Sequence, residues 1–433
     1  MPEFKTVRGM RDFLPEEAYA MRYVEAKARE IARLYGFKEI VTPIVESHEL
    51  LAVKSGEEIR QRMFVFKDLG GRDVTLRPEF TASVARFVAT TFRNEPRPFR
   101  LFSAGSVYRY DEPQKGRYRE FYQSNYELMG SPQPEADVEV LLLTNRLMKS
   151  AGLKNWEFKL GHVGVLRGIF EQEGLDDNTQ NVAMQLMDKK EHDAALEMLR
   201  QAGLREKCID VLRRLVKLKG SDATEICGKV KELVCEYPKS VESSRNLVEI
   251  ARLVEASKSD LKITIDAGFA RGLEYYTGMI FEVYVPALNI ALGGGGRYDK
   301  LIELFGGVPT PAVGVAHGID RIILAMQCQN TTPEVCNQKT VTIIPVQETL
   351  KGETLRIAET LRANCIAVEI EVTGRKVGKA LEDAGRKKLD YAVIVGEREF
   401  KEGGVVLRNL VSREQSIVKT DNLVEVVRGN TQR

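Results

Sequence analysis

A charged loop joins two strand-like runs between residues 100 and 129, and this segment constrains the fold of the chain most. The first run covers residues 100–108, the loop reads Tyr110-Asp-Glu-Pro-Gln-Lys-Gly-Arg117, and the second run returns over residues 119–129. A returning strand of this kind pairs antiparallel with the strand before it. The sequence therefore predicts an antiparallel sheet in the core.

The returning strand carries a row of polar side chains. Because successive side chains alternate between the faces of a strand, Gln123, Asn125 and Glu127 share one face over about 13 Å at ~3.3 Å per residue. Such a row suits an extended polar ligand, and arginines nearby would recognise phosphate through paired hydrogen bonds. These arginines are Arg109, Arg117 and Arg119. Taken alone, the segment is more typical of a solvated ribbon with an exposed basic hairpin.

Two further segments combine glycine with charge. Residues 271–278, RGLEYYTG, follow a strand, and their glycines allow a ligand to approach the backbone closely. A hairpin turn above packed aromatic rings is an equally good interpretation. Residues 314–321, GVAHGIDR, run from a strand into a helix, where Arg321 suits an ATP phosphate or adenine ring. The alternative for Arg321 is an ion pair with Asp320 or Glu303.

The other elements follow from periodicity. Pro15 opens a helix whose apolar residues recur at helical spacing as far as Gly36. The four glycines Gly293–Gly296 are expected to break the chain. Strands are expected at residues 38–42, 64–67, 74–77, 262–266, 279–285 and 312–316, and helices at 136–150 and from 319 onward.

Three regions can be distinguished along the chain. Between about residues 165 and 258 the sequence is rich in Leu, Glu, Lys and Arg and has one proline, which predicts a helical insertion. Residues 329–338 are polar and form the expected linker to a small α/β domain of alternating strands and helices. We therefore assign a discontinuous core to residues 1–163 and 259–328, the insertion to 164–258, and the last domain to 339–433.

Composition excludes several classes of protein. With 64 basic and 62 acidic side chains, a nucleic acid would have to bind at local patches. The six cysteines show no metal-ligand spacing, so we expect no metal site, no disulfide framework and a reduced compartment. The N-terminus lacks a signal-peptide core, and no stretch approaches the ~20 apolar residues of a membrane span. A cytoplasmic protein without a membrane partner is expected.

Several nucleotide-binding and hydrolase motifs are also absent. The sequence has no GxxxxGK[ST] loop, no GxGxxG turn between a strand and a helix, no GxSxG and no HExxH. A P-loop NTPase or a dinucleotide-binding fold therefore gains no support.

In their order, the positive signals resemble the three motifs of class II aminoacyl-tRNA synthetases. The first motif, a long helix and a strand ending in proline, is matched by residues 15–43 and usually forms a dimer interface. The second, a strand ending in arginine with a charged loop and a returning strand, is matched by residues 100–127. The third, a glycine-rich strand and helix ending in arginine, is matched by residues 314–321.

Within this class, four strings resemble histidyl-tRNA synthetase: RGMRD at 8–12, TLRPEFT at 75–81, RGLEYYTG at 271–278 and GGGRYD at 294–299. The resemblance covers nearly the whole chain. It implies an α+β catalytic core with an antiparallel sheet flanked by helices, a helical insertion and a C-terminal α/β anticodon-binding domain.

The resemblance also assigns a histidine pocket. Glu79 and Gln123 would hold the α-amino group, and Glu127 and Tyr276 would reach the imidazole nitrogens, where a carboxylate fixes the tautomer. Tyr298 would close the pocket wall. The full set of implied histidine-binding residues is Glu79, Thr81, Arg109, Gln123, Glu127, Arg271, Tyr275, Tyr276 and Tyr298.

For ATP, the resemblance implies Arg109 and Arg321 at the phosphates and Phe121 against the adenine. Arg109 and Arg271 would act catalytically on the α-phosphate. Asp111 stands where the second motif more often has glutamate, so the contact to ATP is expected at Asp111 or at Glu112. Two more departures are Glu274 in place of aspartate and His317 in place of a small or apolar residue. A structural role is favoured for His317 over a catalytic one, and likewise for His48, His162 and His192.

The implied function is ligation of L-histidine to tRNA through a histidyl-adenylate, with ATP and its bound Mg²⁺, by a homodimer. A non-catalytic regulatory subunit of histidine biosynthesis shares the core fold, but it typically lacks the motif arginines and the last domain, which are present here. Class II synthetases for threonine, proline or glycine carry a similar last domain, and the RGLEYYTG string argues against them.

Overall fold

The computed structural model describes residues 4–53, 55–114, 116–288, 290–333 and 339–429. The chain divides into two compact units, Met1–Pro333 and Glu334–Arg433, and each has its own hydrophobic core. Residues 334–338 of the expected linker lie outside the described residues.

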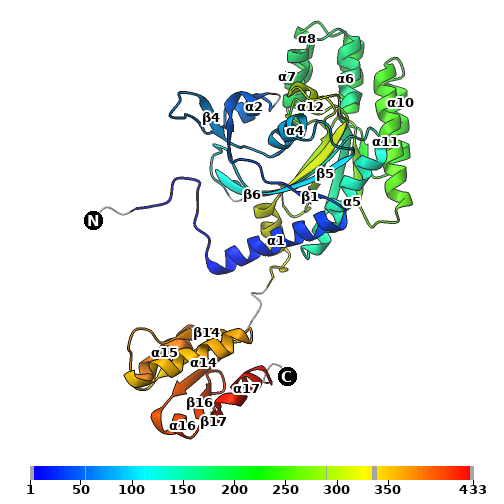
Figure 1. The fold of residues 1–433 in the computed structure, drawn as a ribbon. Coiled ribbons are helices and arrows are strands. Elements are labelled where there is room, and N and C mark those ends of the chain that lie inside the picture. The colour runs from blue at the N-terminus through cyan, green and yellow to red at the C-terminus, as the bar shows by residue number, and fades with distance from the viewer. Residues whose placement is uncertain (1–3, 54, 115, 289, 334–338, 430–433) are drawn as a thin grey trace. The chain divides into compact units, whose positions relative to one another are not determined.

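A nine-stranded sheet runs through the first unit in the order β1-β5-β6-β12-β11-β10-β7-β9-β8 (Figure 1). The six strands from β5 to β7 are antiparallel to their neighbours, whereas β1 is parallel to β5 and β9 is parallel to β7. The expected antiparallel core is thus confirmed, with a parallel pair added on each side. The strands are β1 (Lys38–Glu39), β5 (Phe99–Tyr108), β6 (Glu120–Met129), β7 (Glu157–His162), β8 (Lys219–Gly220), β9 (Ile263–Asp266), β10 (Met279–Tyr284), β11 (Ala291–Arg297) and β12 (Ala312–Gly318).

The four glycines expected to break the chain instead form the middle of β11. Gly293 to Gly296 pair with β10 on one side and with β12 on the other. A Cβ on Gly295 would lie 2.1 Å from the Gly314 carbonyl oxygen, and one on Gly296 would lie 2.5 Å from that of Met279. The prediction was wrong because the glycines are needed where neighbouring strands leave no room for a Cβ. The spacing of residues in the sequence does not reveal this close approach.

Strand β1 is shorter than predicted, with two residues in place of five. The backbone N–H of Ile40 still donates to the Phe102 carbonyl at 2.9 Å, and the chain then leaves the sheet before Pro43. Proline has no N–H for a ladder and biases the preceding residue away from regular pairing.

Helix α1 (Pro15–Leu34) packs against α5 (Pro134–Ser150) and α13 (Ile319–Cys328). Its proline and two acidic residues occupy the first turn, and Met21, Val24, Ala28 and Ile31 form its buried stripe, as expected. The Tyr126 hydroxyl donates to the Ala28 carbonyl at 2.7 Å. This face of β6 is therefore covered by helices, which leaves the face of Gln123 and Glu127 for the site.

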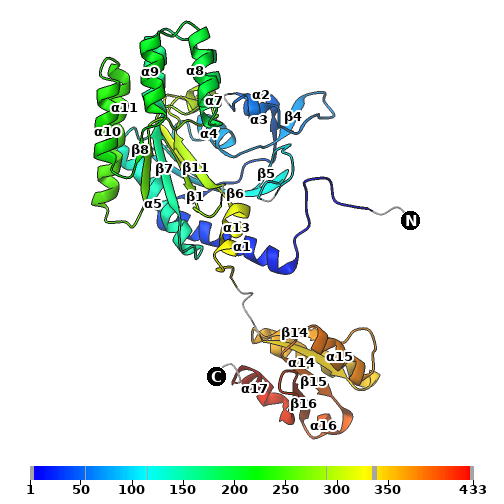
Figure 2. The ribbon, with the colours of Figure 1, turned by 180° about the vertical axis from the view of Figure 1, so that it is seen from behind.

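Six helices form the insertion and stand together beside the β7–β9–β8 side of the sheet (Figures 1 and 2). Apart from β8, which extends the main sheet at its edge, the insertion is helical, as predicted. The helices are α6 (Val163–Gln172), α7 (Asp177–Asp188), α8 (His192–Gln201), α9 (Glu206–Leu215), α10 (Ala223–Leu233) and α11 (Pro238–Ala256).

A small sheet, β2-β4-β3, lies apart from the main one in the same unit. It is formed by β2 (Val45–Ser47), β3 (Val65–Lys67) and β4 (Asp73–Leu76), and it leads to α4 (Thr81–Thr90). Three short helices complete this part: α2 (His48–Ala52), α3 (Glu57–Arg60) and α12 (Leu301–Leu304).

The second unit is a five-stranded sheet, β14-β13-β15-β16-β17, with helices packed on it. The predicted β-α-β-α-β order is present in β13 (Thr340–Pro345), α14 (Lys351–Ala363), β14 (Ala367–Ile370), α15 (Val377–Arg386) and β15 (Tyr391–Val395). Four further elements follow β15 and were not predicted from the sequence. They are α16 (Glu397–Lys401), β16 (Gly404–Asn409), β17 (Gln415–Lys419) and α17 (Leu423–Gly429). Within the described part of both units, no helix has the length and hydropathy to cross a bilayer.

Candidate active site

One pocket opens on the face of the sheet that α1 leaves uncovered. Its floor is formed by β6, β11 and β12, and its rim by the loop before β6 and by residues 271–276. The predicted site residues that line it are Glu79, Thr81, Arg109, Asp111, Phe121, Gln123, Arg271, Tyr275, Tyr276, Tyr298 and Arg321. The structure therefore brings together eleven of the thirteen predicted site residues, and the other two are Glu127 and Glu112.

Glu79 is fixed by the start of α4. Its carboxylate accepts hydrogen bonds from the backbone N–H groups of Thr81 at 2.6 Å and Ala82 at 2.9 Å. These are N–H groups of the first helical turn, which have no partner within the helix. The TLRPEFT string thus ends by placing a carboxylate in the pocket at a helix N-terminus.

Glu127 lies behind the pocket wall and is fully buried. Its carboxylate accepts hydrogen bonds from the Thr81 hydroxyl at 2.7 Å and from the Tyr298 hydroxyl. Burial raises the pKa of Glu127 to about 8, against the lowering effect of these two hydroxyls. A Cβ on Gly314 would collide with the carboxylate. Glu127 is thus a buried acid next to the pocket. Thr81, Tyr298 and the backbone of Gly314, which has no side chain, lie between the two.

Gln123 and the paired tyrosines form the wall next to this acid. The Gln123 Oε1 atom is buried and has no hydrogen-bond partner among the described residues. Tyr275 packs against Tyr276 with ring centroids 4.8 Å apart, and against Tyr298 at 5.7 Å. An unpaired buried amide oxygen costs free energy unless a ligand donates to it. The pocket therefore presents an acceptor that an ammonium or N–H group would satisfy.

Four arginines line the same pocket: Arg109, Arg117, Arg271 and Arg321. Burial, together with the positive charges of Arg109, Arg117 and Arg271, lowers the pKa of Arg321 to about 10. Burial also lowers the pKa of Arg109. Like charges held this close repel one another, so an anionic ligand would stabilise the arrangement.

Two of these arginines are oriented by backbone carbonyls. Arg109 donates through Nε to the Pro78 carbonyl at 2.9 Å, and Arg321 donates through Nη1 to the Ala291 carbonyl at 2.8 Å. The expected alternative, an ion pair of Arg321 with Asp320 or Glu303, is absent from the described structure because Asp320 pairs with Arg11. Each guanidinium keeps further N–H groups for a ligand.

Arg271 is held by carboxylates on two sides. Its Nη1 donates to Glu282 at 2.9 Å, and Lys159 pairs with the second oxygen of Glu282 at 3.4 Å. From the insertion, Asp188 accepts a hydrogen bond from the backbone N–H of Gly272 at 2.7 Å. Although burial lowers the pKa of Arg271, the nearby Tyr276, Glu282 and Asp188 raise it overall. Arg271 is therefore a cation in a fixed orientation. The carboxylates of Glu282 and Asp188 partly neutralise its charge when no anionic ligand is bound.

Asp111 and Glu112, offered as alternatives for ATP, are separated by the structure. Asp111 lines the pocket and accepts a hydrogen bond from Arg62 at 2.9 Å. Glu112 points away from it and pairs with Arg8 at 2.7 Å, where both side chains are exposed. The separate ion pairs with Arg62 and with Arg8 hold the two acids apart. Glu112 is therefore a poorer candidate for the ATP contact than Asp111.

Arg119, predicted to lie near a phosphate, is turned away from the pocket. Its guanidinium stacks on the Tyr110 ring at 3.6 Å, and its Nε donates to the Asp111 carbonyl. Arg109 and Arg117, on the same loop, do line the pocket. Phe121 lines it as well, with its ring 5.4 Å from the Arg109 guanidinium.

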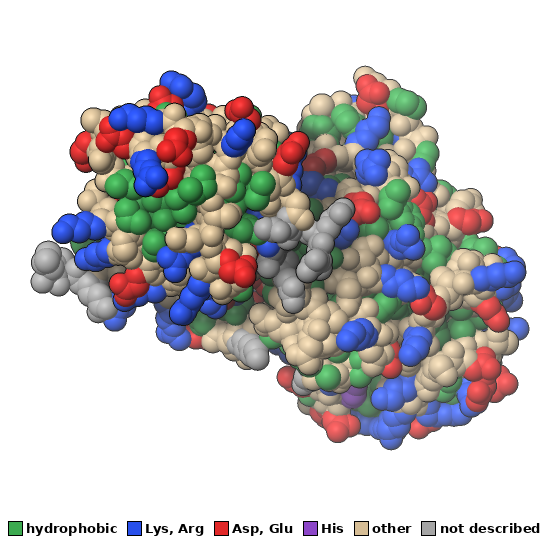
Figure 3. Space-filling model, turned by 90° about the horizontal axis from the view of Figure 1, so that it is seen from below, with side chains coloured by type: hydrophobic (Ala, Val, Ile, Leu, Met, Phe, Trp, Pro, Cys, Tyr) green, Lys and Arg blue, Asp and Glu red, His purple; other side chains and the backbone are tan. Residues whose placement is uncertain are grey.

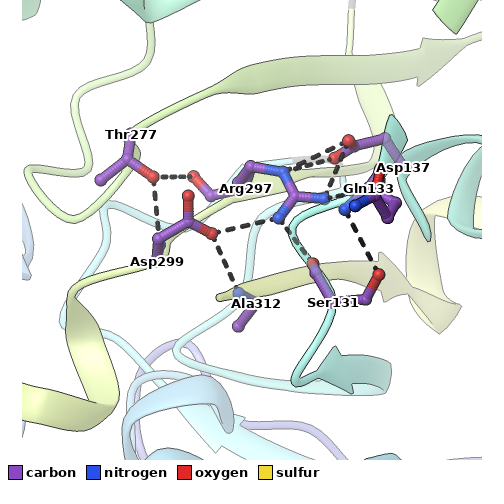
Figure 4. A network of polar contacts seen from close by, with 7 residues as sticks. All are labelled: Ser131, Gln133, Asp137, Thr277, Arg297, Asp299 and Ala312. Carbon is purple, nitrogen blue, oxygen red and sulfur yellow. Dashed lines mark hydrogen bonds and ion pairs between the residues drawn. The ribbon is translucent and has the colours of Figure 1, made fainter. Parts of the chain in front are cut away.

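The GGGRYD string ends in a buried ion-pair network (Figure 4). Arg297 donates to both oxygens of Asp137, to Asp299 and to the carbonyls of Ser131 and Gln133, at 2.9–3.2 Å. The network thereby fixes the backbone on both sides of Tyr298, which carries the hydroxyl that reaches Glu127.

His317 belongs to the helix face of the sheet. Its Nε2 lies 3.0 Å from the Thr144 hydroxyl, its ring meets Tyr126 edge-on, and burial lowers its pKa to about 3. It is neutral at physiological pH and lies outside the pocket, which excludes it as the catalytic base. His162 caps α6 by accepting from the Gly164 N–H, and burial lowers its pKa to about 4.

Sequence reasoning missed several groups that line the pocket, among them Tyr118, Glu282 and Asp320. Glu282 lies on a strand predicted only as a strand, and no local pattern marks it. Asp320 was named only as one alternative ion-pair partner of Arg321, whereas it accepts from the Tyr122 N–H at 2.7 Å. Adjacency in sequence did not predict these partners because consecutive residues of a helix point in different directions.

A mainly antiparallel sheet that aims arginines of a strand–loop–strand and of a strand–helix segment into one pocket defines a class II aminoacyl-tRNA synthetase. Residues 9–322 match the family model of histidyl-tRNA synthetase, and residues 340–430 match that of an anticodon-binding domain. The chain belongs to the histidyl-tRNA synthetase family.

Relatives and solved structures agree with this assignment. A protein named histidine–tRNA ligase from Methanocaldococcus jannaschii is 42% identical over 422 residues, which cover 97% of this chain and 98% of the relative. One of the same name from Pyrococcus furiosus is 39% identical over 427 residues, 98% of both chains. The solved structure of apo histidyl-tRNA synthetase from S. aureus has a TM-score of 0.69 at 25% identity, covering 98% of this chain and 100% of that one.

Proposed function

We propose that the protein ligates L-histidine to tRNA in two steps, by forming histidyl-adenylate from histidine and ATP and then transferring the histidyl group. The observation that carries this function is one pocket with two chemically different groups of side chains. The group around Glu127 offers buried acceptors for an imidazole and an amine, and four arginines in the same pocket suit phosphates.

For histidine, we assign Glu79, Thr81, Gln123, Glu127, Tyr275, Tyr276 and Tyr298, together with Arg109 and Arg271. Glu79 and the unpaired Oε1 of Gln123 suit the α-amino group. Because the Thr81 and Tyr298 hydroxyls already occupy the Glu127 carboxylate, an imidazole N–H would join or displace one of them. A buried acid selects strongly for a ligand that donates to it.

For ATP, we assign Arg109, Asp111, Phe121 and Arg321, and we place Arg109 and Arg271 on the α-phosphate. The histidine carboxylate attacks this phosphate and pyrophosphate leaves. Charge builds on the phosphoryl oxygens, so catalysis depends on positioning and on cations already in place. Mg²⁺ would enter with the ATP phosphates, and Asp111 and Glu282 offer carboxylate oxygens of the kind that it prefers.

In the second step a hydroxyl of the terminal tRNA adenosine attacks the mixed anhydride. In the part of the pocket that the structure describes, the side chains that could act as a base are already paired, and the phosphate of the adenylate itself is the simplest acceptor for the proton.

The second unit would bind the anticodon through basic residues on and around α15, such as Lys376, Lys379 and Lys388. Single-stranded bases would also need stacking partners.

Each proposed domain has its own role in the reaction. The catalytic core comprises residues 1–163 and 259–328, the insertion comprises residues 164–258, and the anticodon-binding domain comprises residues 339–433.

The surface charges are mixed in sign. Lys and Arg are interspersed with Asp and Glu over the face shown in Figure 3, which fits contact with tRNA at local patches.

A homodimer and a cytoplasmic location complete the proposal. Val41 and Ile44, which follow α1 in the first motif, are exposed apolar residues, at 91% and 45%, and a second copy of the chain would cover them. Sedimentation of the purified protein tests the dimer, and a monomer at micromolar concentration would contradict it.

The cysteines bear on the location of the protein. The five described cysteines are free, which suits a reducing compartment such as the cytoplasm.

The regulatory-subunit alternative is disfavoured because Arg109, Arg271 and Arg321 all line the pocket and the last domain is present. ATP–pyrophosphate exchange measured across the twenty amino acids tests the function. Exchange should depend on histidine alone. Exchange with another amino acid would move the protein to a different specificity, and no exchange with any would favour the non-catalytic alternative.

A further inference from the structure

The RGMRD string at residues 8–12 takes no part in the site described so far, yet it lies against the loop of the second motif. The backbone carbonyl of Gly9 accepts a hydrogen bond from the Arg119 N–H at 2.9 Å. Gly9 has φ +83°, and a Cβ there would lie 2.6 Å from the Arg119 side chain. This close approach is the reason that glycine is required, and it fixes the N-terminal segment on the loop.

Arg11 makes the central contact of this segment. Its guanidinium stacks on the Tyr118 ring at 3.6 Å and lies 4.5 Å from the centre of the Phe13 ring. It also forms an ion pair with Asp320. A guanidinium that is stacked and paired at the same time is held in one orientation, which a lysine cannot reproduce.

The two partners of Arg11 are both part of the pocket. Tyr118 and Asp320 line it, and Asp320 directly precedes Arg321 in the first turn of α13. The second oxygen of Asp320 accepts from the Tyr122 backbone N–H at 2.7 Å, next to Phe121. One ion pair therefore joins the N-terminal segment, the start of β6 and the helix that carries Arg321.

We propose that Arg11 is a positioning residue for ATP, which holds the loop of the second motif and the first turn of α13 at their places around the residues of the pocket assigned to ATP. It acts through Tyr118 and Asp320, and it does not itself line the pocket. The described contacts of Arg11 are with Phe13, Tyr118 and Asp320, none of which is assigned to histidine, so Arg11 has no direct influence on histidine binding. The inference rests on the proposed function for the identity of the nucleotide.

Calorimetric titration of the whole protein with ATP, and separately with histidine, tests this role without depending on turnover. Arg11→Ala should weaken ATP binding at least about tenfold, the effect of one charge-assisted contact. Arg11→Lys should fall between this variant and the unchanged protein, because it keeps the charge but loses the stacking. Histidine affinity should stay within about twofold in both. The matched control is Arg252→Ala, because Arg252 is an exposed arginine of α11 that pairs with Glu249.

A double-mutant cycle separates positioning from general stability. If Arg11 acts through Asp320, Arg11→Ala and Asp320→Asn together should weaken ATP binding no more than the stronger single change. Equal losses of ATP and histidine affinity, or a lower melting temperature with unchanged ATP affinity, would overturn the proposal. If the unchanged protein binds ATP but shows no histidine-dependent exchange, the proposed function fails while the titrations still decide the role of Arg11.

Discussion

At the scale of single residues, Arg271 should dominate the rate of adenylate formation. It is a partly buried cation that is oriented by Glu282 and lines the pocket. A preplaced donor of this kind is typically worth about 100–1000-fold in rate. Arg271→Ala should therefore slow adenylate synthesis by two to three orders of magnitude in a rapid-quench measurement, and histidine binding should weaken less.

The control for this change is Arg213→Ala, because Arg213 is an exposed arginine of α9 that pairs with Asp210. It should leave the rate unchanged. If Arg271→Ala synthesised adenylate within a few-fold of the unchanged protein, Arg271 would not contact the α-phosphate.

Glu127 should set the choice of amino acid, because it is a buried acid assigned to histidine. Glu127→Gln keeps the shape but removes a carboxyl group that can ionise when an imidazole N–H donates to it, and hydrogen bonds to a charged acceptor are worth about 1.5–3 kcal/mol. At 1.36 kcal/mol per decade, kcat/KM for histidine should fall by roughly one to two decades in the exchange assay. KM for ATP should change little. An unchanged KM for histidine would show that Glu127 only supports Thr81 and Tyr298.

The same substitution should change how stability depends on pH. Burial raises the pKa of Glu127 from an ordinary 4.5 to about 8, so the folded protein keeps a proton that the unfolded chain releases. This group therefore favours folding most below about pH 4.5, and the advantage is lost as the pH rises towards 8. Melting temperatures of ligand-free protein should show the unchanged chain losing stability relative to Glu127→Gln over that range. A constant difference would contradict the raised pKa.

At the scale of elements, β11 should tolerate no side chain at its centre. Gly295→Ala would place a Cβ 2.1 Å from the Gly314 carbonyl, between two paired strands. Strands β11 and β12 would have to separate beneath the pocket. Denaturant unfolding should show a loss of several kcal/mol, at the upper end of single substitutions, which usually cost about 0.5–3 kcal/mol.

Gly228→Ala is the matched control for this prediction. Gly228 lies within helix α10, and a Cβ added there would meet no neighbouring part of the described structure within 4 Å. Alanine should stabilise the helix by about 0.5–1 kcal/mol. If both alanines changed stability equally, the clash in β11 would not be the cause.

At the scale of the whole molecule, catalysis and tRNA recognition should be separable. The first unit contains the entire pocket, and the second has its own core. Truncation after Pro333 keeps the contacts of Gln329 with Lys154 and Asn155 at the end of the core. The truncated protein should perform histidine-dependent exchange but charge tRNA poorly.

The salt dependence of tRNA binding provides a second test that catalysis and tRNA recognition are separable. tRNA binding by the full chain should weaken as salt rises, because phosphate contacts release counterions, and the slope should be smaller for the truncated protein. Undiminished charging by the truncated protein would show that the last domain has another role.

The prediction from sequence was best where neighbouring residues determine the structure. The periodicity of residues 15–34, the hairpin of β5 and β6 and the helical insertion depend on contacts within one element or between adjacent ones. Strand β7 and the last two strands, β16 and β17, were not anticipated, because short strands are defined by their pairing partners.

The sequence by itself determined the family, because its strings occur in an order that few folds share, and most of the site residues that it predicted line the pocket. The tertiary structure decided three matters that depend on distant groups. Gly293 to Gly296 form a strand because β10 and β12 leave no room for side chains. Asp111 faces the pocket and Glu112 does not, because Arg62 and Arg8 hold them apart. Glu127 is a buried acid with a raised pKa because residues 46 and 171 positions away, Thr81 and Tyr298, enclose it.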